Sequence, residues 1–118
     1  MQLVYYSFTN NTKRFVDKLQ SDIDIVELND YNRSESFILI TPTYNIGQIP
    51  KPVKKFLEEH GSNMLGVIGT GNKNWGPTYG LASNKIASMY DVTLLYKLEL
   101  SGNKKDIEIV DNIIKNMT

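Results

Sequence analysis

Short apolar runs alternate with longer amphipathic stretches along the chain, and this alternation predicts strands and helices in turn. The run Phe-Ile-Leu-Ile at residues 37–40 is unbroken, which is typical of a strand that is covered on both faces. The other apolar runs are also short and are bounded by polar or Gly-containing segments. We therefore expect strands at residues 3–6, 23–28, 37–40, 64–69 and 92–100.

Four stretches carry apolar residues at helical spacing, so each is expected to form a helix with one apolar face. The expected faces are Phe15, Val16 and Leu19 within residues 12–20; Val53, Phe56 and Leu57; Tyr79, Ala82, Ile86 and Met89; and Ile107, Val110, Ile114 and Met117. Pro52 suits the first turn of the second helix, where its missing N–H costs little. Gly61 is expected to end that helix.

Alternation of strands and helices requires crossover connections, which favour a mostly parallel sheet with helices on both faces. Five short strands in 118 residues fit a small doubly wound sheet. The sequence therefore predicts an α/β fold, a flavodoxin-like three-layer α-β-α sandwich. Its five-stranded parallel sheet is expected to have the strand order 2-1-3-4-5, and residues 1–118 are expected to form a single domain.

Composition narrows the possible functions. The 13 Lys and Arg residues balance 13 Asp and Glu residues, so there is no net charge to attract nucleic acid or an anionic membrane. The absence of Cys excludes disulfides, thiolate nucleophiles and Cys-zinc sites, and the single His makes a metal site improbable. No apolar run approaches the roughly 20 residues that span a bilayer, and no signal-type leader is present, so a cytoplasmic protein is expected.

The loops that follow the first, third and fourth strands are the expected ligand site. In open α/β sheets, ligands bind outside the carboxyl ends of the strands, where the strand order reverses. The first loop (residues 7–11), the second loop (41–52) and the third loop (70–78) are also dense in Ser, Thr, Asn and Gly, and the third contains the only Trp. This coincidence of position and composition points to a binding site.

The first loop runs directly into the first helix with the sequence Ser7-Phe8-Thr9-Asn10-Asn11-Thr12. Its hydroxyls, together with the free N–H groups at the helix start, are suited to holding a phosphate. The loop has neither the G-x-G-x-x-G pattern of dinucleotide sites nor the Gly-Lys-Ser/Thr ending of P-loop proteins. The alternative interpretation is that an Asn or Thr simply caps the helix.

The second and third loops are suited to a flat heterocycle. The second contains Thr43-Tyr44-Asn45-Ile46-Gly47, and the third contains Gly71-Asn72-Lys73-Asn74-Trp75-Gly76. Amides can hydrogen-bond the edge of such a ring while Tyr44 or Trp75 lies against its face. The alternative is that both loops are surface turns in which Gly and Asn adopt positive φ. No pair of carboxylates and no Ser/His/Asp set is placed for catalysis, so no catalytic or metal-binding residue is expected.

At these loops the sequence resembles the NrdI family, the small flavodoxin-like proteins that support class Ib ribonucleotide reductases. The most specific segment runs from Gly66 to Gly76 and contains the family's G-N-x-N-[FW]-G pattern. The segments at residues 4–15 and 96–102 also agree, so the resemblance covers essentially the whole chain. Two departures are Asn45-Ile46, where many members have a Gly-rich loop, and Leu98, where Phe is usual.

The resemblance implies non-covalent binding of FMN and transfer of reducing equivalents from the flavin to dioxygen. The resulting superoxide or peroxide would serve the reductase small subunit, whose dimanganese site then generates a tyrosyl radical. Such a protein is an electron donor to oxygen rather than a conventional enzyme, and it requires a further electron donor to reduce its flavin. The expected partners are therefore the small subunit, dioxygen and that donor.

The resemblance also implies roles for individual residues. The FMN phosphate would be held by the first loop, through Ser7, Thr9, Asn10, Asn11 and Thr12, with Phe8 beside them. The isoalloxazine would lie between Thr43, Tyr44, Asn45, Ile46 and Gly47 on one side and Gly71, Asn72, Asn74, Trp75 and Tyr79 on the other.

Two other functions remain open on the sequence. The first is general flavodoxin-type electron transfer. Flavodoxins commonly surround the flavin with acidic residues, whereas the candidate loops hold no Asp or Glu and include Lys73, which favours a two-electron donor to oxygen. The second is a flavin-free module that docks on a protein partner. The visible spectrum of the purified protein distinguishes this last function from the other two.

Overall fold

A five-stranded parallel sheet forms the middle layer of the molecule, and the computed structural model describes all residues from Met1 to Thr118. The strand order is β2-β1-β3-β4-β5, which confirms the predicted topology. The strands are β1 (Gln2–Tyr5), β2 (Asp24–Glu27), β3 (Phe37–Pro42), β4 (Met64–Gly71) and β5 (Thr93–Glu99).

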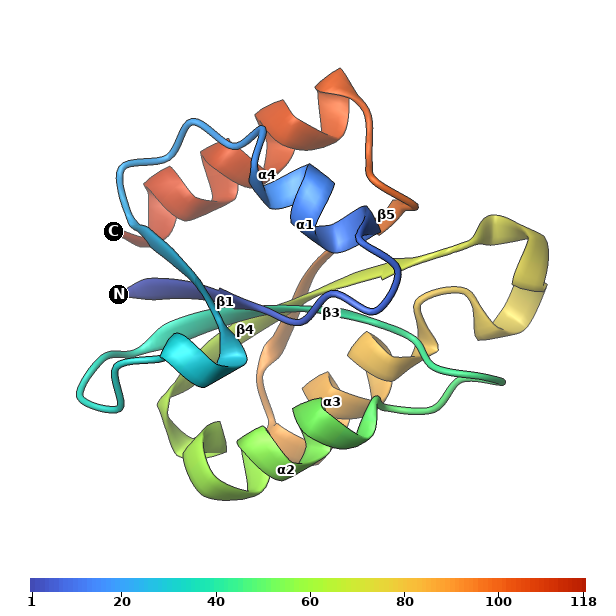
Figure 1. Cartoon of the computed structure of the whole chain (residues 1–118), viewed down its shortest axis with the longest axis horizontal. Coiled ribbons are helices and arrows are strands. Elements are labelled where there is room, and N and C mark those ends of the chain that lie inside the picture. Colours follow the sequence, from blue (N-terminus) through green and yellow to red (C-terminus); the bar gives the residue numbers. More distant parts are fainter.

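Four α-helices cover the sheet in two pairs, so the predicted three-layer sandwich is confirmed (Figure 1). They are α1 (Asn11–Val16), α2 (Lys51–His60), α3 (Leu81–Tyr90) and α4 (Lys104–Met117). In Figure 1, α1 and α4 lie above the sheet, whereas α2 and α3 lie below it. Three short 3₁₀ turns complete the chain at Leu28–Asp30, Gly61–Asn63 and Lys73–Thr78. No helix combines the length and the apolar character that a membrane crossing requires.

Each face of the sheet has its own apolar core, because successive side chains of a strand point to opposite faces. Ile38 of β3 belongs to the core beneath α1 and α4, whereas its neighbour Leu39 belongs to the core above α2 and α3. Both are fully buried. This two-sided burial explains why the 37–40 run has no polar residue.

Helix α1 is shorter than the expected helix over residues 12–20, since it ends at Val16. The chain then turns toward α4, where the Asp111 carboxylate accepts hydrogen bonds from the Gln20 backbone N–H at 3.1 Å and from the Ser21 hydroxyl. Leu19 lies in this turn and still packs against the core. The apolar spacing was therefore a correct sign of burial but not of helix length.

Helix α3 also differs from the expectation. It begins at Leu81, after Gly80 adopts a left-handed conformation with φ 59°, so Tyr79 precedes the helix. Ala82 and Ile86 are buried as expected, but Met89 is 61% exposed. The prediction that Tyr79 and Met89 extend the buried helical face is wrong, because the helix starts later and its last turn presents Met89 to solvent.

Helix α2 begins and ends where predicted. Pro52 occupies its first turn, and Gly61 follows its last residue. Gly61 is not left-handed, however, since its φ is −58°. A Cβ at this position would lie 2.4 Å from the ring of Tyr90, so close packing against α3 explains the glycine.

Parallel pairing brings the carboxyl ends of β1, β3 and β4 to one edge of the sheet. The loops that follow these strands project together from that edge, at the right of Figure 1. The sheet therefore brings together the three segments that the sequence singled out.

Candidate functional site

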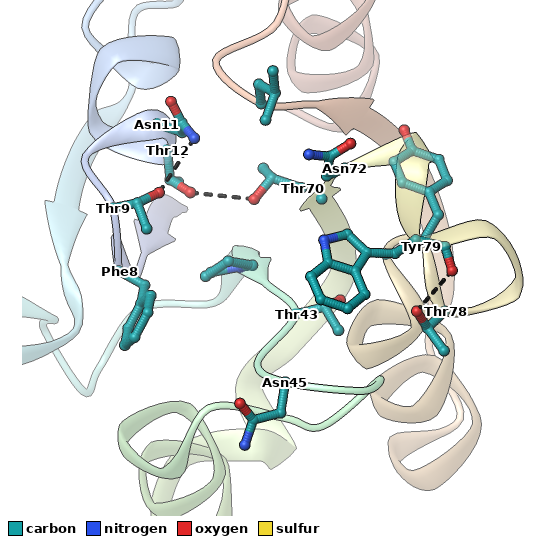
Figure 2. Close-up of a pocket in the computed structure, with 15 residues that line it drawn as sticks. Phe8, Thr9, Asn11, Thr12, Thr43, Asn45, Thr70, Asn72, Thr78 and Tyr79 are labelled. Carbon is teal, nitrogen blue, oxygen red and sulfur yellow. Dashed lines mark hydrogen bonds between the residues drawn. The ribbon is translucent and has the colours of Figure 1, made fainter.

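The first, second and third loops together enclose a pocket of about 340 Å³ (Figure 2). None of the side chains that line it carries a charge. The lining residues are Phe8, Thr9, Asn11, Thr12, Pro42, Thr43, Asn45, Thr70, Gly71, Asn72, Trp75, Thr78, Tyr79, Gly80 and Leu100. Hydroxyl, amide and aromatic groups are therefore the means by which this site can bind a molecule.

One wall of the pocket, called the hydroxyl wall below, is a cluster of hydroxyls and an amide from Thr9, Asn11, Thr12 and Thr70. Thr12 at the start of α1 and Thr70 at the end of β4 are 2% and 3% exposed, and their hydroxyl oxygens lie 3.3 Å apart. Figure 2 shows this contact as a dashed line between the two side chains, with Thr9 and Asn11 on the same side as Thr12. The Asn11 side-chain amide donates to the Thr9 hydroxyl at 3.2 Å. The wall can donate several hydrogen bonds to one anionic group.

Helix capping does not account for this wall. Asn10 occupies the N-cap position of α1 with φ 68°, but its side chain makes no capping hydrogen bond. Ser7 takes that role, because its hydroxyl accepts the backbone N–H of Lys13 at 3.2 Å. Neither Ser7 nor Asn10 is among the lining residues, whereas Thr9, Asn11 and Thr12 are.

The second loop forms a tight turn closed by two backbone hydrogen bonds between Tyr44 and Gln48, at 2.7 and 2.8 Å. Asn45 and Gly47 adopt positive φ within it, which is the conformation that the alternative interpretation of this loop assigned to Asn and Gly. Thr43 and Asn45 line the pocket. The Thr43 hydroxyl accepts the backbone N–H of Ala82 at 3.1 Å, which ties this loop to the start of α3.

The other residues predicted from the second loop lie outside the pocket. The ring of Tyr44 meets that of Phe8 edge-on at a centroid distance of 5.3 Å and lines a neighbouring hollow. Ile46 is 73% exposed at the tip of the turn. Gly47 is buried, and a Cβ there would lie 2.6 Å from a methyl group of Leu81.

The third loop supplies Thr70, Gly71, Asn72, Trp75 and Thr78 to the pocket, and Tyr79 follows it. Trp75 is 59% exposed, so its position is not explained by burial in the core. Asn74 is not a lining residue, and its backbone N–H donates to the Asn72 side-chain oxygen at 2.9 Å. This bond fixes the start of the short 3₁₀ segment that carries Trp75.

One carboxylate lies behind the third loop. Glu99, the last residue of β5, accepts the backbone N–H of Lys73 at 3.0 Å. The candidate loops themselves hold no Asp or Glu, but this carboxylate lies directly behind the third of them. Burial, followed by the charges of Glu99 and Asp106, raises the pKa of Tyr79.

Five lining residues were not predicted from the sequence: Pro42, Thr70, Thr78, Gly80 and Leu100. Thr70, at the start of the predicted third loop, immediately precedes the G-N-x-N-W-G segment, so its position was a usable signal. Leu100 gave no such signal. It lines the pocket because the chain leaves β5 with Leu100 at φ 54°, a conformation that is uncommon for Leu.

Comparison with known proteins adds to this geometry. A family model described as NrdI flavodoxin-like matches residues 3–112. A protein from Macrococcus caseolyticus named Protein NrdI is 42% identical over 108 residues, which cover 92% of this chain and 84% of that protein.

Solved flavodoxin structures share the fold. A short-chain flavodoxin associated with a non-canonical PDU bacterial microcompartment superposes with a TM-score of 0.74 at 17% identity, covering 99% of this chain and 97% of that one. A Fusobacterium nucleatum flavodoxin bound to flavin mononucleotide superposes with a TM-score of 0.68 at 15% identity, covering 98% and 95%. At these identities the likeness concerns the fold alone.

Proposed function

The chain belongs to the NrdI flavodoxin-like family, and we propose that it binds FMN between its three loops and passes electrons from the reduced flavin to dioxygen. One electron converts dioxygen to superoxide, and two electrons with two protons convert it to hydrogen peroxide. The oxidant then serves assembly of the dimanganese-tyrosyl radical cofactor in a class Ib ribonucleotide reductase small subunit. The flavin supplies the redox chemistry, and the protein binds and orients it.

The observation that carries this proposal is the uncharged lining of the pocket. FMN combines a phosphate, which needs several hydrogen-bond donors, with a flat ring, which needs an aromatic or apolar contact and polar groups at its edge. Thr9, Asn11 and Thr12 are suited to the phosphate, whereas Asn72 and Trp75 are suited to the ring. The residues present therefore fit the cofactor.

The absence of charge in the lining also suits the proposed electron transfer. Negative charge that develops on the ring during reduction is not opposed by a lining carboxylate. Hydrogen-bond donors on the loops can instead stabilise that charge, since they are held in place before the reaction. We expect these donors to come chiefly from backbone N–H groups and from Asn72.

The mouth of the pocket is apolar and accessible, which suits contact with a protein partner and with dioxygen. Phe8 is 57% exposed, Trp75 59% and Leu100 46%, and all three line the pocket. Ile46, at the tip of the second loop, is 73% exposed. Exposed apolar groups gathered at one place are typical of an interaction surface.

Cofactor binding is tested by titrating the apoprotein with FMN, FAD and riboflavin while the Trp75 fluorescence is recorded. We expect one FMN per chain with quenching of Trp75, and weaker binding of FAD, because one hydroxyl wall serves one phosphate. Equal or tighter binding of FAD contradicts this part of the proposal. A protein that is purified without colour and binds no flavin is instead the flavin-free docking module.

The redox role is tested with FMN-loaded protein that is photoreduced without oxygen. Addition of oxygen is expected to yield superoxide or peroxide, and manganese-loaded small subunit is expected to gain a tyrosyl radical, detected by electron paramagnetic resonance. Omitting either oxygen or the reducing step provides the control. A reduced protein that is inert to oxygen but reduces a one-electron acceptor is a general electron-transfer flavodoxin.

A further inference from the structure

The segment that carries Trp75 has little packing of its own. Within the 3₁₀ segment Lys73–Thr78, no residue is buried. Its internal hydrogen bonds, such as the one from the Thr78 hydroxyl to the Trp75 carbonyl at 3.1 Å, shape the segment but do not attach it to the rest of the molecule. Its position relative to the pocket must therefore depend on contacts from neighbouring elements.

Strand β5 and the turn that follows it provide those contacts. The Glu99 carboxylate accepts the Lys73 backbone N–H at 3.0 Å. The Leu100 backbone N–H donates to the Gly71 carbonyl at 2.8 Å, and the Lys97 ammonium donates to the Tyr79 carbonyl at 3.2 Å. These contacts hold the segment at both of its ends.

Glu99 is the anchor that can be altered most cleanly. The Leu100 contact is made by backbone, and Lys97 also lies over the Tyr79 ring, 5.6 Å from its centroid. Glu99, in contrast, makes one hydrogen bond through its side chain, and that bond reaches the residue two positions before Trp75. Because the acceptor is a carboxylate, the bond is stronger than one between neutral groups.

We propose that Glu99 is a positioning residue for flavin binding, which holds the Lys73 peptide so that Asn72 and Trp75 form a preassembled wall for the ring. This inference rests on the proposed function, since it assigns the ring of FMN to the third loop. Glu99 acts through that loop and is not a lining residue itself. Removal of the Glu99 carboxylate should therefore weaken binding of the ring and leave the hydroxyl wall around Thr12 unaffected.

The test compares FMN and riboflavin, which share the ring but differ in the phosphate. Glu99→Ala is expected to raise both dissociation constants by the same factor, about 5- to 20-fold. Glu99→Gln retains an oxygen that can accept the Lys73 N–H, so its affinities are expected to stay within about threefold of wild type. Glu99→Asp, whose carboxylate is one methylene shorter, is expected to resemble Glu99→Ala. The matched control is Glu108→Ala, which removes an exposed carboxylate on α4.

A second readout needs no ligand. Trp75 is the only tryptophan, so its fluorescence anisotropy in the apoprotein reports the mobility of the third loop. Glu99→Ala and Glu99→Asp are expected to lower the anisotropy, whereas Glu99→Gln and Glu108→Ala are not. If wild type binds neither flavin, the proposed function fails, but the anisotropy still tests the anchor.

Three results overturn the inference. The first is unchanged affinity and anisotropy in both Glu99→Ala and Glu99→Asp. The second is a Glu99→Gln variant as impaired as Glu99→Ala, which means that charge rather than the hydrogen bond matters. The third is a loss of FMN affinity that greatly exceeds the loss of riboflavin affinity, which means that Glu99 acts on the hydroxyl wall.

Discussion

Replacement of Thr12 by Val tests whether the hydroxyl wall holds a phosphate. Val has nearly the shape of Thr but no hydroxyl, so the change removes a hydrogen-bonding group from a site that is 2% exposed without opening a cavity. Thr12→Val is expected to weaken FMN binding strongly and to leave riboflavin binding unchanged, because riboflavin has no phosphate. Thr12→Ser retains the hydroxyl and serves as the matched control.

The magnitude follows from the hydrogen bonds that are lost. A hydrogen bond to a charged group contributes about 1.5–3 kcal/mol, which corresponds to an increase of roughly 10- to 150-fold in the dissociation constant of FMN. The apoprotein is affected as well, since the Thr70 hydroxyl loses its partner at 3.3 Å while remaining 3% exposed. An unpaired buried hydroxyl costs about 1–3 kcal/mol of unfolding free energy.

The two effects are measured separately. Isothermal titration calorimetry gives the dissociation constants of FMN and riboflavin, and urea denaturation of the apoprotein gives the unfolding free energy. If Thr12→Val weakens FMN and riboflavin by the same factor, the variant has distorted the pocket and the assignment of this wall to the phosphate is refuted. If neither affinity changes, the phosphate binds elsewhere.

Three further changes address the ring, the titration of a tyrosine and the packing of α3. Trp75→Ala is expected to weaken both flavins by about 5- to 100-fold in a fluorescence-independent absorbance titration, with little loss of stability because Trp75 is 59% exposed. The hydrogen bond to Asp106, and then burial, raise the pKa of Tyr96 from 10.0 to about 12. The contribution of this hydrogen bond to stability is therefore complete below pH 10 and is lost as the pH rises to 12. The difference in unfolding free energy between wild type and Tyr96→Phe, of order 1 kcal/mol, should shrink over that interval in urea titrations. Gly69→Ala places a Cβ 2.2 Å from the Ser83 hydroxyl oxygen and is expected to cost about 1–3 kcal/mol of unfolding free energy, part of which Ser83→Gly should restore in the double variant.

The architecture was predictable because the signals that specify it are local. The unbroken run at 37–40 predicted a strand covered on both faces, and β3 has a core on each side. Pro52 predicted the start of α2 correctly. Element ends were less predictable, because they depend on contacts that are distant in sequence. Helix α1 ends early at a turn that Asp111 of α4 holds in place.

The location of the site was predictable, but the orientation of its residues was not. The rule that ligands bind at the carboxyl ends of the strands singled out the three loops that line the pocket, since it depends only on strand order. Which side of each loop faces the pocket depends on the turn that the loop adopts. The tight turn between Tyr44 and Gln48 directs Ile46 to solvent, although its neighbour Asn45 lines the pocket.

The charges around the site also could not be predicted from the sequence of the loops alone. The three loops contain no acidic residue, and from sequence alone this favoured a two-electron donor to oxygen over a general electron-transfer flavodoxin. Glu99 is 26 residues from Lys73 and belongs to none of the loops, yet the pairing of Gly71 with Glu99 between β4 and β5 brings it to the back of the third loop. The charge near this site therefore includes what the sheet register brings in, and here the register adds one carboxylate behind an uncharged lining. The Glu99 carboxylate accepts the backbone N–H of Lys73, so it contributes a hydrogen bond to the third loop as well as a negative charge.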